Sequence, residues 1–160
     1  MSRDTIRDRA IYALTKAFDR AVGAARDEAG YVDRIEDNLS TAIDWHHVCP
    51  FFAQGAGGEI DDREDEKAKM RAIHSSSALA VNAFGHWLGR EGELTLCGQS
   101  GFKSLLFEAK CPTGLQGTPP HLDVLAEADE WVVGVESKCL EPLTDHKAVF
   151  AASYDSLRET

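Results

Sequence analysis

The spacing of the apolar residues changes near the middle of the chain, and this change limits the fold more than any other feature. Before Gly89 apolar side chains recur every three or four residues, which is typical of amphipathic helices; after it they alternate with polar ones, which is typical of strands. We therefore expect a helical part over residues 1–88, a small mixed β-sheet over residues 92–141 and a short helix over residues 144–158. This predicts an α+β, three-layer fold in a single domain, residues 1–160.

The first part is expected to contain three helices. Their apolar spacing covers residues 2–29, residues 31–43 and residues 62–88. The intervening stretch "DWHHVCPFFAQGAGGE", residues 44–59, contains a proline and several glycines, so we expect a loop or flap there.

The second part is expected to contain four strands. Alternating patterns occur in "ELTLC" (residues 93–97), "FKSLLFEAKC" (102–111), "HLDVLAEA" (121–128) and "WVVGVESKCL" (131–140). A tight turn joins the last two, which predicts an antiparallel hairpin.

Charge and hydropathy exclude several classes of protein. The net charge is −10, which argues against a broad basic surface that coats nucleic acid. No run of 18 apolar residues exists, so we expect no membrane span. The N-terminal stretch "MSRDTIRDRA" lacks the apolar core of a secretory signal, and we expect a cytoplasmic protein.

The cysteines are scattered, which does not suggest a disulfide framework. His46, His47 and Cys49 could begin a zinc site, but no second Cys/His pair follows at the spacing of a zinc finger. Small buried thiols are therefore the favoured interpretation.

Charged residues interrupt the last expected strand. Glu136 and Lys138 are two residues apart and should share one face, with Asp123 on the neighbouring strand of the hairpin. Two carboxylates in a partly buried sheet raise each other's pKa unless a cation lies between them, and hard oxygen ligands suit Mg²⁺ or Mn²⁺. A lysine beside them can position water or offset charge that develops on a phosphate.

The segments "FEAKCPTGLQGTPPHLDV" and "VGVESKCLEPL", together with "HSSSALAVNAFG", resemble the PD-(D/E)xK nuclease superfamily, which has the restriction-endonuclease-like fold. Over roughly residues 70–143 the chain is similar to a bacterial branch of restriction endonucleases. The resemblance implies a Mg²⁺- or Mn²⁺-dependent DNA endonuclease that hydrolyses phosphodiester bonds. It implies that Asp123 and Glu136 are catalytic metal ligands, that the Ser137 carbonyl is a third ligand, and that Lys138 is the catalytic lysine.

A second Glu-x-Lys pattern, "FEAK", includes Glu108 and Lys110, but no proline-led aspartate precedes it at hairpin distance. We therefore expect Glu108 to be an accessory acid on a neighbouring strand. Superfamily members often carry a glutamate on the helix before the sheet, and residues 74–88 contain none. The other accessory candidates are Glu36 as a substitute for that acid, His121 and Glu141 as neighbours of the motif, and Asn82.

Two alternatives remain open. One is a catalytically inactive nuclease-fold module that binds nucleic acid or a protein partner, and the other is a helical scaffold in which the three charges meet by accident. The superfamily core is αβββαβ, and about twenty residues follow the last strand, enough for the helix but hardly for the closing strand. A sheet edge left open there would invite homodimer formation.

Overall fold

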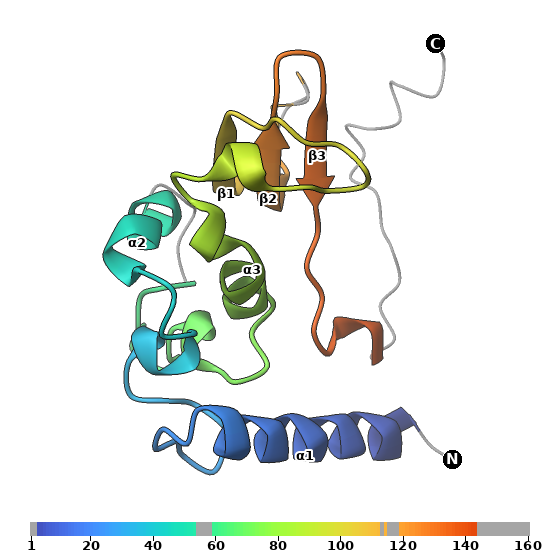
Figure 1. Cartoon of the computed structure of the whole chain (residues 1–160). Coiled ribbons are helices and arrows are strands. Elements are labelled where there is room, and N and C mark those ends of the chain that lie inside the picture. The colour runs from blue at the N-terminus through green and yellow to red at the C-terminus, as the bar shows by residue number, and fades with distance from the viewer. Residues whose placement is uncertain (1–2, 54–58, 113, 115–118, 144–160) are drawn as a thin grey trace.

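The computed structural model describes residues 3–53, 59–112, 114 and 119–143. Figure 1 shows the helices first along the chain and then a small sheet, so the expected α+β fold is confirmed. The expected helix over residues 144–158 lies outside the described residues. The helices and strands are α1 (Arg3–Ala21), α2 (Trp45–Ala53), α3 (Ser76–Phe84), β1 (Ser104–Lys110), β2 (His121–Glu127) and β3 (Val132–Val135).

The sheet is an antiparallel meander with the order β1-β2-β3. The strands expected over residues 102–111 and 121–128 are confirmed by β1 and β2. The last strand is shorter than expected, because β3 ends at Val135 and the "ESK" residues follow it. The described strands are all antiparallel, so the mixed sheet we expected is not found among them.

A strand was also expected over residues 93–97, and this prediction is wrong. A short 3₁₀ helix occupies Glu91–Glu93, and a single bridge joins Leu96 to Gln99. Cys97 has a φ of 51°, in the left-handed region, so the chain turns back on itself where the strand would run.

The first helix is shorter than its apolar pattern predicts. Gly23 has a φ of 68°, and its N–H donates to the Phe18 carbonyl at 3.1 Å, which ends α1 before the expected stop at Gly30. Residues 31–43 form only a 3₁₀ helix, Ile35–Asn38, instead of the expected longer helix.

The loop expected over residues 44–59 is wrong in its first part, which forms α2. The Asp44 side chain accepts a hydrogen bond from the His46 N–H at 3.0 Å, as an N-cap residue does. Pro50 lies inside the helix, which is nonetheless retained because Val48 and Phe52 are buried against the rest of the molecule.

The long helix expected over residues 62–88 is also wrong. Only α3 is an α-helix there, and it begins where the Ser75 hydroxyl accepts a hydrogen bond from the Ala78 N–H at 3.2 Å. Upstream, the buried Asn38 amide donates to the carbonyls of Met70 and Ala72 at 2.8 and 2.7 Å. A helix would need those carbonyls for its own hydrogen bonds, so this segment remains mostly irregular.

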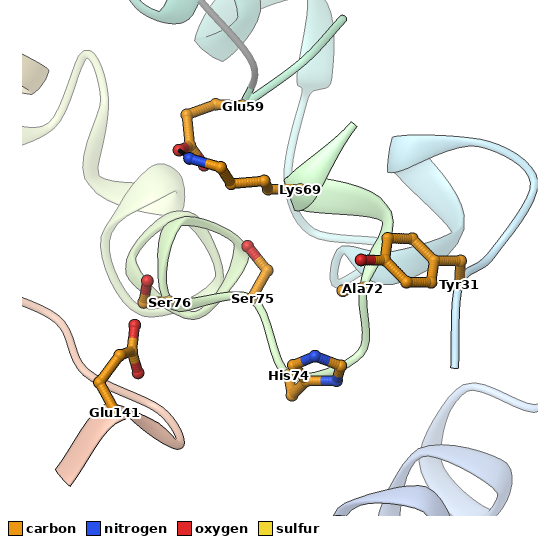
Figure 2. A pocket seen from close by; sticks show the side chains of 8 residues that line it. All are labelled: Tyr31, Glu59, Lys69, Ala72, His74, Ser75, Ser76 and Glu141. Carbon is orange, nitrogen blue, oxygen red and sulfur yellow. Dashed lines mark hydrogen bonds and ion pairs between the residues drawn. The ribbon is translucent and has the colours of Figure 1, made fainter. Parts of the chain in front are cut away.

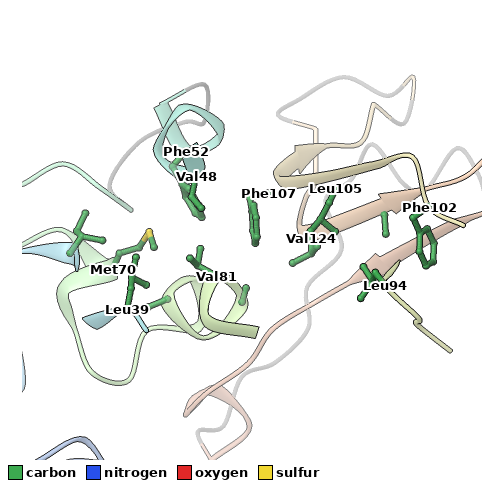
Figure 3. Packing of buried hydrophobic residues seen from close by; sticks show 14 residues of the cluster. Leu39, Val48, Phe52, Met70, Val81, Leu94, Phe102, Leu105, Phe107 and Val124 are labelled. Atoms are coloured by element: carbon green, nitrogen blue, oxygen red, sulfur yellow. The ribbon is translucent and has the colours of Figure 1, made fainter. Parts of the chain in front are cut away.

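The core lies between the helices and one face of the sheet, as Figure 3 shows. Helix α2 packs on β1 and α3 on β2. The ring of Phe107 on β1 stacks on Phe52 of α2 with centroids 6.0 Å apart and meets Phe51 edge-on at the same distance. These contacts set the sheet against α2 and α3 and so position the strand ends that carry the charged residues. Figure 1 shows α1 lying across the helical half, on the side away from the sheet.

Within the described ranges, the chain forms no helix that combines the length and the apolar character required to cross a membrane.

Candidate active site

Asp123 lies between two other acids in the sheet. The register of β1 against β2 places Glu108 opposite Asp123, and the register of β2 against β3 places Glu136 on its other side, at the first residue past β3. Burial raises the pKa of Asp123; a hydrogen bond from the Ser137 N–H opposes this, and the Glu136 carboxylate raises the pKa further. The structure therefore brings Asp123 and Glu136 together with Glu108, as an accessory acid would require.

Glu108 has an unusual backbone for a strand residue. Its φ is 49°, and the ladder of paired residues between β1 and β2 skips this position. Such a conformation costs on the order of 1–3 kcal/mol in a residue with a side chain and is concentrated at functional sites. Burial raises the pKa of Glu108, and the carboxylates of Glu59 and Asp123 raise it further. Glu108 thus combines a strained backbone with a side chain that neighbouring carboxylates repel.

His121, at the start of β2, partly offsets this negative charge. Its Nδ1 lies 3.6 Å from the Glu108 Oε2, and the interaction acts to lower the pKa of Glu108. The other ring nitrogen, Nε2, is buried and has no hydrogen-bond partner among the described residues. The structure therefore places His121 beside Glu108, and its role as a neighbour of the motif stays a prediction.

A fourth acid, Glu59, was not predicted from the sequence. Its Oε1 accepts a hydrogen bond from Lys69 Nζ at 2.8 Å, and its Oε2 accepts one from the Ser77 hydroxyl of α3 at 2.7 Å. Glu59 extends the series of acids, because it raises the pKa of Glu108. In the sequence Glu59 stands in the acidic stretch "EIDDREDEK", which is typical of a solvated surface. We call Glu59, Glu108, Asp123 and Glu136 the acid row.

The "ESK" residues form the other end of the acid row. Lys138 Nζ forms an ion pair with Glu136, and this hydrogen bond raises the pKa of Lys138. Between them, the Ser137 N–H donates to Asp123 Oδ2 at 2.6 Å and the Ser137 hydroxyl donates to the Ser76 carbonyl at 2.9 Å. These two bonds tie the hairpin to the beginning of α3. The role of the Ser137 carbonyl stays a prediction.

The remaining predicted site residues lie in different environments. Glu141 accepts a hydrogen bond from the Cys139 N–H at 2.7 Å and interacts electrostatically with Lys138, so it borders the site. Glu36 is exposed and lies 3.9 Å from the Arg34 guanidinium. The Asn82 amide bonds to the backbone of Ser40 and Asn38. The structure brings neither Glu36 nor Asn82 to the acid row.

The donors of the acid row suit a hydrated magnesium ion better than a fully protein-bound metal. Among the described residues, no three His, Cys, Asp or Glu side chains gather closely enough to form a metal cage. Mg²⁺ typically keeps several waters and is held by one or two carboxylates. Asp123 and Glu136 offer that pair. Burial raises the pKa of Asp123 and the Glu136 carboxylate raises it further, and a nearby cation would oppose both effects.

Comparison of the chain with known proteins shows the family to which it belongs. Residues 31–160 match the family REase-ARP, described as Restriction Endonuclease associating with ARP. Neither a curated protein nor a solved structure matches the chain. The matched range includes the whole acid row and Lys138, and only α1 and the turn after it precede that range. The resemblance to restriction endonucleases is thereby confirmed, and the chain belongs to the REase-ARP family.

Proposed function

We propose that this protein is a metal-dependent DNA endonuclease that hydrolyses phosphodiester bonds at the acid row. The observation that carries the proposal is the convergence of Asp123, Glu136 and Lys138 at one end of the β2–β3 hairpin. A carboxylate of raised pKa, such as Asp123, close to a lysine is typical of a phosphate-cleaving site, and the chain belongs to a family of restriction endonucleases. DNA as the substrate agrees with the cytoplasmic location expected from the sequence.

Asp123 and Glu136 would hold Mg²⁺ or Mn²⁺, with the Ser137 carbonyl as a third oxygen donor. Bound there, the ion would supply charge stabilisation for the phosphate and a water of lowered pKa. The hydrogen bond from the Ser137 N–H fixes one oxygen of Asp123, so its other oxygen can face the ion. This hydrogen bond would keep the Asp123 carboxylate oriented for the metal before the substrate binds.

Lys138 would act on the substrate. Its side chain is about half exposed, and its ammonium remains within reach of the acid row because Glu136 holds it. A fixed positive charge at that place can donate to a phosphate oxygen and offset the negative charge that develops during cleavage. Glu59 would take the role of the acid that precedes the sheet, which we expected Glu36 to fill.

The test is cleavage of plasmid, linear and branched DNA in Mg²⁺ and in Mn²⁺. We expect the wild-type protein to cut at least one of these substrates and the Asp123→Ala variant to cut none of them. An Asp129→Ala variant is the matched control, because Asp129 lies in the exposed turn between β2 and β3 and contacts only Lys103 among the hydrogen bonds described. Equal cleavage by Asp123→Ala and wild type would refute the assignment of the site.

A second candidate function is a catalytically inactive module that binds nucleic acid or a protein. The net charge of −10 favours it, because a DNA-cleaving surface would repel phosphate except at local cations. The description of the family speaks of association with ARP, which agrees with a role that involves a partner. Binding of DNA or protein without any metal-dependent cleavage would support this alternative.

We propose that homodimer formation, expected from an open sheet edge, uses the outer edge of β3. Strand β3 is one of the two outer strands of the described sheet. At its beginning, Val132 is 63% exposed, and Trp131, the residue before it, is 38% exposed. An apolar edge of this kind pairs readily with another strand. Sedimentation analysis would show the dimer, and a Val132→Lys variant should weaken it.

A further inference from the structure

A hollow of about 310 Å³ begins at the Glu59 end of the acid row (Figure 2). It lies between the 3₁₀ turn Lys69–Arg71, the beginning of α3 and the 3₁₀ turn Glu141–Leu143. Glu141, in its wall, interacts electrostatically with Lys138 at the other end of the row. The hollow therefore borders the candidate active site. Its lining residues are Tyr31, Glu59, Lys69, Ala72, His74, Ser75, Ser76 and Glu141.

Both carboxylates in the wall of the hollow are already bonded. Glu59 accepts from Lys69 and from the Ser77 hydroxyl, and Glu141 accepts from the Cys139 N–H. Burial lowers the pKa of His74, and the nearby Arg7 lowers it further, which favours the neutral imidazole. Of the described residues that line the hollow, Lys69 alone carries a permanent positive charge.

The pair formed by Lys69 and Glu59 is asymmetric in its exposure. The Glu59 side chain is 23% exposed and fixed by Ser77, whereas the Lys69 side chain is 65% exposed. Figure 2 shows both side chains at the same end of the hollow, with Lys69 reaching toward Glu59. The partly buried Glu59 carboxylate thus holds the ammonium of a largely exposed lysine at the edge of the site. This arrangement resembles that of Lys138, which Glu136 holds at the opposite end.

We propose that Lys69 binds a backbone phosphate of DNA next to the phosphate that is cut. The inference rests on the proposed endonuclease function and adds a second point of contact with the substrate. A chain of net charge −10 needs local cations wherever a phosphate approaches, and Lys69 and Lys138 lie at the two ends of the acid row. Lys69 therefore contributes to substrate binding, and Lys138 contributes to the chemical step.

The experiment measures binding of a fluorescein-labelled DNA duplex in Ca²⁺ by anisotropy, across a salt series. Loss of one phosphate contact should weaken binding by Lys69→Met about tenfold at roughly 0.1 M salt and reduce the slope of log affinity against log salt by about one. Lys69→Arg should restore both quantities, because arginine keeps the charge. The matched control is Lys103→Met, since Lys103 is 67% exposed and also paired with an acid, Asp129.

The salt slope separates substrate contact from a structural role. A lysine that only neutralises Glu59 would leave the slope unchanged, and that result with Lys69→Met would overturn the inference. Circular dichroism of each variant checks that it is folded, and Lys69→Arg gives a second test if Lys69→Met is not. If the wild-type protein cuts DNA and Lys69→Met binds DNA equally well, only this inference fails. If the wild-type protein neither binds nor cuts DNA, the proposed function fails with it.

Discussion

The two ends of the acid row are built differently, although each consists of a glutamate and a lysine. Glu136 and Lys138 are two residues apart, so the local course of the chain after β3 is enough to pair them. Glu59 and Lys69 are ten residues apart, and their place depends on the Ser77 hydroxyl of α3. Exposed ion pairs of this kind contribute about 0–1 kcal/mol to stability. The ion pair at the hairpin end thus joins neighbours in one short stretch, whereas the Glu59 end depends on contacts between separate segments, namely the Met70 N–H on the Glu59 carbonyl at 2.9 Å and the Ser77 hydroxyl on its carboxylate.

The largest effect is expected at the hairpin end. Lys138→Met should lower the turnover of DNA cleavage by on the order of 10²-fold or more, because it removes one preorganised positive charge from the transition state. Single-turnover kinetics in Mg²⁺ and duplex binding in Ca²⁺ separate rate from affinity, and the affinity should remain close to that of the wild type. Cleavage at the wild-type rate would show that "ESK" is not the catalytic motif.

A smaller effect is expected at the other end. Glu59→Gln should weaken Mn²⁺ binding or DNA cleavage by about 10- to 100-fold, as loss of a group that supports a metal site does. Glu36→Gln is the matched control, because Glu36 is an exposed acid that the structure places away from the acid row. Equal losses in the two variants would contradict the assignment of Glu59 to the site.

Ser77→Ala removes the hydrogen bond that α3 donates to Glu59 and leaves Glu136 and Lys138 unchanged. The variant should cost about 1 kcal/mol in the free energy of unfolding, because Glu59 loses a buried hydrogen-bond donor. Chemical denaturation measures this cost. DNA cleavage by Ser77→Ala should then decrease, as is expected for Glu59→Gln. The ion pair between Lys138 and Glu136 should persist. Loss of activity as severe as that of Lys138→Met would show that the two ends are not independent.

The smallest expected effect concerns the stability of the metal-free protein. Burial and neighbouring acids raise the pKa of Asp123 and of Glu108 above their values in the unfolded chain. Their contribution to stability is therefore fully present below the unfolded pKa and is lost as the pH rises through the folded pKa. Asp123→Asn and Glu108→Gln should raise the melting temperature of the metal-free protein at neutral pH, and less so at mildly acid pH. A lower melting temperature at neutral pH would contradict the repulsion within the acid row.

The difference between contacts within one stretch of sequence and contacts between distant segments explains how much could be predicted from the sequence. Strands β1 and β2, and the hairpin residues Asp123, Glu136 and Lys138, depend on alternation and short spacing, which are visible in a single stretch of sequence. The helix expected over residues 62–88 failed because the Asn38 amide binds carbonyls 32 and 34 residues further along the chain. Glu59 was missed for a similar reason, since its partner Ser77 lies 18 residues away on another element.

The most direct test of the proposed active site is whether the acid row binds a metal ion. Titration of Mn²⁺ into the wild-type protein, followed by calorimetry, should show an ion bound at the acid row. The Asp123→Asn variant keeps the shape of the side chain and an oxygen that can accept the Ser137 N–H, but it removes the charge at the centre of the row. We predict that Asp123→Asn loses this binding, and that Asp129→Asn, in the exposed turn, keeps it. Equal Mn²⁺ binding by the wild-type and Asp123→Asn proteins would contradict the account.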